Sequence, residues 1–164
     1  MKRKSDHTNK ITRYKREGRK LLDIQWDEKG QSLYQSIRYI TENINGDICT
    51  SDYNASKVVV VTASGEYRFS YSGHHSQSGF CPYGICTDVL GHILVCNNYF
   101  TFNENCFSVH LLDINGHFRS ILITQDQCPK YPCALCIDHQ YNFWIGGWEC
   151  STVSVYKYLQ KTEK

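Results

Sequence analysis

The chain has 164 residues, of which 41% are hydrophobic and 13% aromatic, and its formal net charge is +2. This is one domain's worth of sequence with enough apolar residues to bury a core, and the aromatic content suits the packing of sheets. No apolar run approaches the roughly 20 residues of a membrane span. No apolar segment follows the charged N-terminus as it would in a signal peptide. We therefore expect a cytoplasmic protein that makes no membrane contact.

Positive charge is concentrated at the start of the chain. Nine of the 18 Lys and Arg residues lie in 1–20, whereas the remainder carries nine of them against 14 Asp and Glu. We interpret residues 1–10 as a basic arm, most simply a solvated terminus or a strand edge kept soluble by its charge. A second interpretation is non-specific contact with phosphate groups. The residues that would make such contacts are Lys2, Arg3, Lys4, Lys10, Arg13, Lys15 and Arg16.

A hairpin pattern occurs three times along the chain. Apolar or β-prone runs flank turns that contain Gly18, Gly65 and Gly116, and these glycines are 47 and 51 residues apart. Glycine at such a turn can adopt the positive φ that tight hairpins need. A strand-based repeat of roughly 40–50 residues is typical of a β-propeller blade.

A second repeat lies between these hairpins. Residues 82–95 match 132–145 without a gap at a spacing of 50, and residues 40–50 match 85–95 at a spacing of 45. Each copy consists of a short apolar strand, a polar turn at Asn43, Asp88 or Asp138, and a second apolar strand. Together with the hairpin, this pattern predicts a four-stranded unit with strands a, b, c and d.

Counting these units predicts an all-β fold, a partial propeller of about three four-stranded antiparallel blades. Closed propellers typically have four to eight blades, so we expect an open arc. Missing blades or a second chain would be needed to complete it. The predicted propeller spans residues 11–160 and is followed by a tail at 161–164. Its parts are a half blade at 11–26, complete blades at 37–73 and 82–123, and a partial blade at 131–159.

The nine cysteines do not predict a metal site or a disulfide framework. Their number is odd and there is no sign of secretion, which disfavours disulfides. Cys133 and Cys136 have the spacing of half a zinc site, but no second pair matches them. We expect buried packing for these thiols, with no metal and no cofactor.

No catalytic residue can be assigned from the sequence. Asn43, Asp88 and Asp138 recur at one position of the repeat, which favours a structural role in turns over catalysis. The histidines form no recognisable pattern with a nucleophile.

Several segments resemble NHL repeats, among them residues 40–49, 82–88, 91–96 and 111–118. The resemblance covers about residues 10–160. More narrowly, these segments are similar to the C-terminal propellers of tripartite-motif proteins, particularly those of invertebrates such as molluscs. In that family a RING finger recruits a ubiquitin-conjugating enzyme, and the propeller selects protein or RNA targets. This chain contains no RING, B-box or heptad pattern, so the resemblance implies a non-catalytic target-recognition module. The alternatives are an RNA-binding propeller and, with less support, an enzyme similar to the propellers of lactonases and amidating lyases. Those propellers hold a metal near the central axis, and no metal motif is visible in this sequence.

Partner contacts are expected on loops at one end of the blades. The b–c loops and the d–a connections should open at the same end, because alternate connections of an up-and-down sheet share an end. The segment 97–106 is predicted to be a long aromatic loop, either folded over its own aromatics or contacting a protein partner. The candidate contact residues are Tyr53, Asn54, His74, His75, Tyr83, Asn98, Tyr99, Phe100, Tyr131 and Trp148.

Overall fold

The computed structural model describes residues 9–102 and 104–158 and contains thirteen β-strands. Lys2, Arg3 and Lys4 of the predicted arm lie outside the described residues, as does the predicted tail at 161–164. Within the described part of the chain, no helix is long and apolar enough to cross a membrane.

The strands form four antiparallel sheets, each from consecutive segments of the chain. The first is the hairpin of β1 (Ile11–Tyr14) and β2 (Lys20–Ile24). The second contains β3 (Ile37–Glu42), β4 (Ile48–Asp52), β5 (Lys57–Val61) and β6 (Tyr67–Tyr71). The third contains β7 (Pro82–Thr87), β8 (Ile93–Phe100), β9 (Asn105–Leu112) and β10 (Phe118–Ile123). The fourth contains β11 (Pro132–Ile137), β12 (Asn142–Gly147) and β13 (Val153–Lys157).

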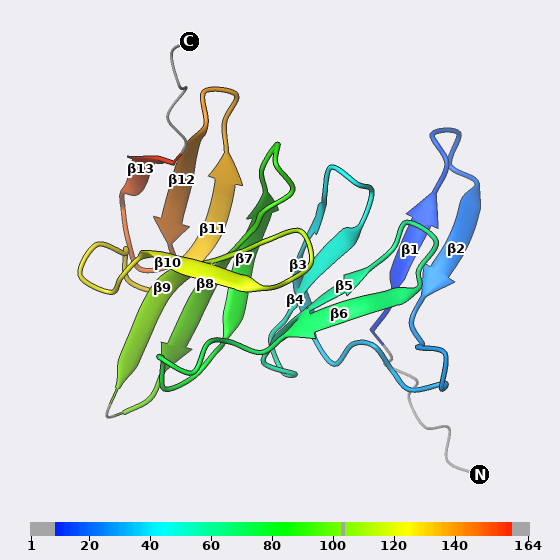
Figure 1. The fold of residues 1–164 in the computed structure, drawn as a ribbon, viewed down its shortest axis with the longest axis horizontal. Coiled ribbons are helices and arrows are strands. Elements are labelled where there is room, and N and C mark those ends of the chain that lie inside the picture. Colours follow the sequence, from blue (N-terminus) through cyan, green and yellow to red (C-terminus); the bar gives the residue numbers. More distant parts are fainter. Residues whose placement is uncertain (1–8, 103, 159–164) are drawn as a thin grey trace.

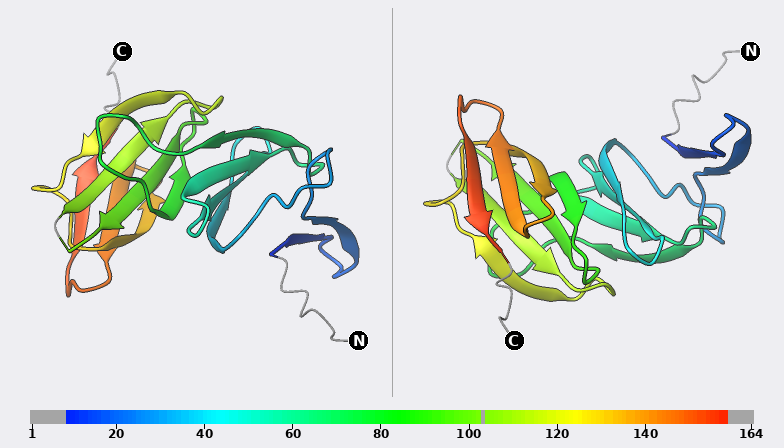
Figure 2. Two further views of the ribbon diagram at one scale, coloured as in Figure 1. Left: turned by 90° about the horizontal axis from the view of Figure 1, so that it is seen from below. Right: turned by 90° about the horizontal axis from the view of Figure 1, so that it is seen from above.

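The sheets follow one another as an open arc, from the β1–β2 hairpin at one side of the molecule to β11–β13 at the other (Figure 1). The first strands of the three larger sheets lie next to one another, with β7 contacting both β3 and β11. Figure 2 shows the same succession from two further directions. The predicted all-β fold and open partial propeller are therefore confirmed.

Each of the three predicted hairpins is closed by a tight turn that contains glycine. Gly18, Gly65 and Gly116 have φ values of 80°, 91° and 84°, which is the conformation that the repeat predicted. The Asp turns between strands a and b are closed by side chains: Asp88 Oδ1 accepts from the backbone N–H groups of Leu90 and His92, at 2.9 and 2.8 Å. Asp138 makes the equivalent bonds at 2.8 and 2.9 Å, so both carboxylates act in the turns.

Apolar cores lie between neighbouring sheets. Val58 to Val61 are all fully buried, because β5 is covered on both faces. Val58 and Val60 pack toward the third sheet, and Val59 and Val61 pack toward the hairpin. A separate core joins the third sheet to the fourth. Alternate residues of a strand thus hold successive sheets together, as stacked blades require.

Two expectations about local structure were wrong. The predicted loop at 97–106 is mostly strand, because β8 and β9 stay paired from Ile93↔Leu112 out to Phe100↔Asn105 and leave only a tight turn. Asn98, Tyr99 and Phe100 therefore belong to β8, and Tyr83 belongs to β7 rather than to a connection. Asn97, which disfavours a strand by propensity, is accommodated because its side chain is hydrogen-bonded to the preceding connection.

The thiols also differ from the expectation of uniform burial. Cys49, Cys86 and Cys96 are buried, but Cys136 is exposed, because the face of β11 on which it lies has no sheet packed against it. All nine cysteines lie in the described part of the chain and are free thiols. No group of three His, Cys, Asp or Glu side chains within residues 9–102 and 104–158 is arranged to hold a metal.

Candidate functional site

A repeated backbone hydrogen bond brings the b–c turns and the d–a connections to one end of the arc. The N–H of Tyr53 donates to Ser36 at 3.0 Å. The N–H of Asn98 donates to Cys81 at 2.8 Å, and that of Trp148 donates to Tyr131 at 3.0 Å. Three successive sheets therefore share an equivalent hydrogen bond, which joins the end of the sheet's second strand to the connection that precedes the sheet.

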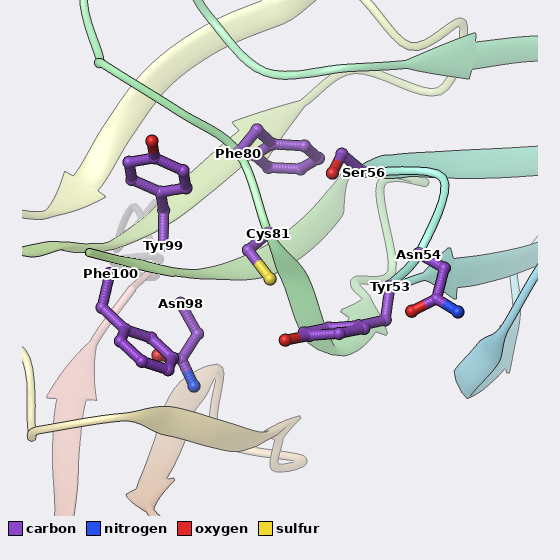
Figure 3. A pocket seen from close by; sticks show the side chains of 8 residues that line it. All are labelled: Tyr53, Asn54, Ser56, Phe80, Cys81, Asn98, Tyr99 and Phe100. Atoms are coloured by element: carbon purple, nitrogen blue, oxygen red, sulfur yellow. The ribbon is translucent and has the colours of Figure 1, made fainter. Parts of the chain in front are cut away.

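A groove of about 330 Å³ opens at this end, between the second and third sheets (Figure 3). Its walls come from the β4–β5 turn, the connection before β7 and the outer end of β8. Five of the ten predicted contact residues line it, namely Tyr53, Asn54, Asn98, Tyr99 and Phe100. The sequence did not indicate its other lining residues, which are Ser56, Phe80 and Cys81.

Aromatic rings extend the groove toward the fourth sheet. Phe100 also lines a second hollow of about 370 Å³ that includes Tyr131. The Phe100 and Tyr131 rings meet edge to face with centroids 5.4 Å apart, and the Tyr131 and Trp148 centroids are 6.5 Å apart. Phe100 and Trp148 are 49% and 76% exposed, so both present apolar surface to solvent. We call the surface formed by Tyr53, Tyr99, Phe100, Tyr131 and Trp148 the aromatic end.

One cation lies beside this surface. The Arg38 guanidinium stacks over the Tyr53 ring at 5.0 Å from the centroid, in a cation–π contact. Tyr53 in turn meets Tyr83 edge to face at 5.4 Å. Burial raises the pKa of the Cys81 thiol, despite the opposing effects of a Tyr53 hydrogen bond and the Arg38 charge. The groove wall at Cys81 is therefore neutral near pH 7, and Arg38 supplies positive charge at its edge.

Asn98, which lines the groove, carries an unpaired acceptor. Asn98 is 2% exposed, and its Oδ1 is buried with no hydrogen-bond partner among the described residues. An unpaired buried carbonyl oxygen costs free energy, and this atom is inaccessible to solvent in the structure. Asn98, Asn54 and Ser56 are the polar side chains of a groove whose other walls are mainly aromatic.

Buried polar side chains hold the connection that forms one groove wall. Asn97 Oδ1 accepts from the Cys81 N–H at 2.8 Å, and Asn97 Nδ2 donates to the Gly79 carbonyl at 3.0 Å. Gln77 Oε1 lies 2.6 Å from His110 Nε2, 3.0 Å from Ser108 Oγ and 3.0 Å from Asn97 Nδ2. These contacts fix residues 77–81 on the third sheet. Tyr99 then lies against Gly79, where an added Cβ would come within 2.3 Å of its ring.

The remaining predicted contacts lie elsewhere. His74 stacks on Phe118 of β10, with centroids 3.9 Å apart, and His75 packs against His74. Neither histidine lines the groove. The basic residues are also partly engaged: Lys10 pairs with Asp23 at 2.8 Å, and Arg13 donates to the Ala63 carbonyl at 2.6 Å. Lys15 and Arg16 are exposed in the β1–β2 turn.

Comparison with known proteins identifies the fold and no family. No protein-family model matches the chain, and no curated protein matches it. A protein of unknown function from Bacteroides caccae superposes with a TM-score of 0.61 at 13% identity, covering 88% of this chain and 49% of that one. A catalytically inactive virginiamycin B lyase from Staphylococcus aureus, solved with quinupristin, superposes with a TM-score of 0.57 at 16% identity. That match covers 94% of this chain and 50% of the lyase.

These matches place the chain among β-propeller structures. The chain spans about half the length of each. At such low identities the likeness concerns the fold alone, because one propeller architecture supports many unrelated functions.

Proposed function

We propose that this chain is a non-catalytic interaction module that binds a segment of a protein partner at the aromatic end. The observation that carries the proposal is the groove beside Tyr53, Tyr99 and Phe100, formed where the loops of two sheets meet. Exposed aromatic rings on a rigid sheet scaffold are typical of protein-binding surfaces. The resemblance to tripartite-motif propellers supports the same role, with the module selecting a target for a ubiquitin ligase and carrying no transfer activity itself.

The groove favours a particular kind of ligand. Its apolar walls suit a bulky aliphatic or aromatic side chain, while Arg38 suits an acidic residue beside it. We therefore propose an extended peptide segment that contains an apolar anchor and a neighbouring Asp or Glu.

Truncation of the exposed aromatics should weaken binding without unfolding the protein. Peptides selected from a random display library on the wild-type chain should bind Phe100→Ala and Trp148→Ala at least about 30-fold more weakly, since an aromatic anchor typically contributes about 2 kcal/mol or more. Isothermal titration calorimetry would measure the affinities. Tyr67→Ala is the matched control, because Tyr67 is 47% exposed on β6 and is not part of the aromatic end. Equal loss in the control, or no loss in either the Phe100 or the Trp148 variant, would contradict the proposal.

The RNA-binding alternative has less support from the geometry. Asp23 pairs with both Lys10 and Lys20, with N–O distances of 2.8 and 2.7 Å, and its carboxylate offsets one of their two positive charges. Sequence-specific RNA recognition needs exposed stacking aromatics beside basic groups. Here the aromatic end is formed by the second, third and fourth sheets, whereas the basic residues cluster on the first.

A further inference from the structure

The third strand of the fourth sheet lies at an edge. Among the described strands, β13 pairs only with β12, from Asn142↔Lys157 to Gly146↔Val153. The third strands of the second and third sheets, β5 and β9, are interior strands, because β6 and β10 pair with their other sides. The structure therefore shows, in two sheets, what kind of strand lies beside the position that β13 occupies.

β13 has the features of an interior strand. Its ladder with β12 contains no register shift, and neither do the interior ladders β4–β5 and β8–β9. Every ladder that the other edge strands form contains a register shift. Each of those edge strands also carries a cation or a proline, namely Arg13, Lys20, Arg38, Arg68, Pro82, Arg119 and Pro132.

Bulges, prolines and charged side chains protect an edge strand from pairing with other chains. β13 has none of these from Val153 to Tyr156, and its one charged residue, Lys157, is the last of the strand. Its outer edge is therefore suited to the addition of an extended strand.

Val155 of β13 has the place that Val60 has in β5. The two residues pair with Trp144 and Cys49, which occupy the same position of the repeat. On its other side Val60 pairs with Phe69 of β6, and Phe69 packs on the core that contains Val60. Val60 is fully buried, whereas Val155 is 46% exposed. An apolar side chain on an added strand would have Val155 as its cross-strand neighbour, as Phe69 has Val60.

Val153 repeats this relation two residues earlier. Its equivalents are Val58, which pairs with Tyr71 of β6, and Val109, which pairs with Ile123 of β10. Both equivalents are fully buried, whereas Val153 is 62% exposed. Two alternate positions of β13 thus match a strand that carries apolar side chains at two alternate positions.

Charge adds a third requirement. β6 runs antiparallel to β5, so an added strand of the same direction would begin beside Lys157, which is exposed. In the second sheet the residue at the start of β6 is preceded by Glu66, so an acidic residue fits that position. Residues 1–8 and 159–164 do not carry this pattern, since Met1 and Leu159 are their only apolar residues.

We propose that the outer edge of β13 binds an extended segment of a partner protein as a fourth, antiparallel strand. The segment carries aromatic or β-branched residues at two alternate positions, beside Val155 and Val153, and an acidic residue at its N-terminal end, beside Lys157. Main-chain hydrogen bonds would give affinity, and the alternate side chains would give specificity. This site is separate from the groove, which lies between the second and third sheets.

A capped peptide with the sequence of residues 65–72 is the probe, because it contains Glu66 and all of β6. Fluorescence anisotropy of the labelled peptide should show saturable binding to the full chain with a Kd below about 1 mM. Val155→Lys should weaken binding at least about 10-fold, because it places a cation at the centre of the edge and removes an apolar neighbour. Circular dichroism would confirm that the variant folds. Val89→Lys is the matched control, because Val89 is 53% exposed in the turn after β7.

Two N-methylated peptides test for main-chain pairing. The N–H groups of Phe69 and Ser70 point to opposite sides of an extended strand. Methylation of one should weaken binding at least about 10-fold, and methylation of the other should change it less than about 2-fold. The unmodified peptide should also slow hydrogen exchange in residues 153–157 and leave residues 98–100 of the groove unchanged.

Four results would overturn the proposal. The first is the absence of saturable binding up to about 1 mM peptide. The second is equal affinity for both N-methylated peptides, or equal affinity of Val155→Lys and the wild type. The third is slower exchange in residues 98–100 in place of 153–157, which would assign the peptide to the groove. The fourth is a wild-type dimer that Val155→Lys dissociates, because a second copy would then occupy the edge.

Discussion

Replacing Asp52 with Ala should lower the free energy of unfolding by about 4 kcal/mol, given that hydrogen bonds to a charged group contribute about 1.5–3 kcal/mol each. Asp52 is fully buried at the end of β4. Its carboxylate accepts from the backbone N–H groups of Gln35 and Ser36, at 2.6 and 2.8 Å, and from that of Ala55 at 3.2 Å. Alanine would leave three partly buried amides without their acceptor. Urea denaturation monitored by fluorescence would give the change.

Matched variants separate this role from a general effect of charge. Asp52→Asn keeps one acceptor oxygen and should lose about half as much stability, since fewer bonds are broken. Asp126→Ala removes an exposed carboxylate from the segment after β10 and should stay within about 0.5 kcal/mol of the wild type. A loss below about 1 kcal/mol for Asp52→Ala would show that water replaces the carboxylate easily.

Acid should destabilise the protein through His110. The side chain is fully buried, and this burial, with a smaller effect of the His74 charge, lowers the pKa of His110 to about 4. In the unfolded chain its pKa is about 6.5. As the pH falls from 6.5 toward 4, the unfolded state takes up a proton that the native state excludes. Stability should therefore decrease by up to about 1.4 kcal/mol per pH unit, about 3 kcal/mol in total.

The same series on His110→Gln isolates this contribution. Glutamine can keep a donor and an acceptor near Tyr71 and Gln77, which contact the imidazole nitrogens at 2.7 and 2.6 Å, but it does not titrate. All other ionisable groups are common to both proteins, so their contributions cancel in the comparison. The wild type should lose about 3 kcal/mol more than His110→Gln between pH 6.5 and 4. If stability fell equally with pH in the wild type and in His110→Gln, that result would contradict the inference that His110 is buried as a neutral imidazole.

Turn chemistry made the architecture predictable from sequence. Gly65 and Gly116 mark hairpins that must adopt positive φ, and the Val58 to Val61 run requires a strand covered on both faces. Such signals are local, since each follows from a few adjacent residues. Their recurrence at spacings near 50 then defines the blade without knowledge of long-range contacts.

The side-chain hydrogen bonds that hold the walls of the groove in place were not predicted, because they join residues that are far apart in the sequence. Asp52 and Asn97 are both fully buried, lie 45 residues apart at the same blade position, and both hold the preceding connection. That spacing equals the one between the repeats and could have identified them. In the fourth sheet the position is Gly147, where an added Cβ would lie 2.1 Å from the Lys130 carbonyl oxygen. At this position the backbones of Gly147 and Lys130 approach each other closely, and no side chain is needed to hold the connection.

The candidate site was partly predictable for a related reason. Up-and-down connectivity correctly brought Tyr53 and Phe100 to one end, because alternate connections share that end. It could not show that His74 would turn away to stack on Phe118, since that depends on the path of a ten-residue connection. The exposure of Cys136 could not be predicted from the sequence either, because it depends on what covers the last sheet.

Photo-crosslinking tests the proposed binding surface most directly. A library-selected peptide that carries a photoreactive group beside its apolar anchor would be irradiated on the wild-type chain, and the modified residues would be mapped by mass spectrometry. We predict crosslinks in the β4–β5 turn, at Phe80 and Cys81, and along β8 from Asn98 to Phe100, all of which line one groove. Crosslinks gathered instead at the opposite end of the sheets, around Val89 and His139, or on the β1–β2 hairpin, would contradict the account.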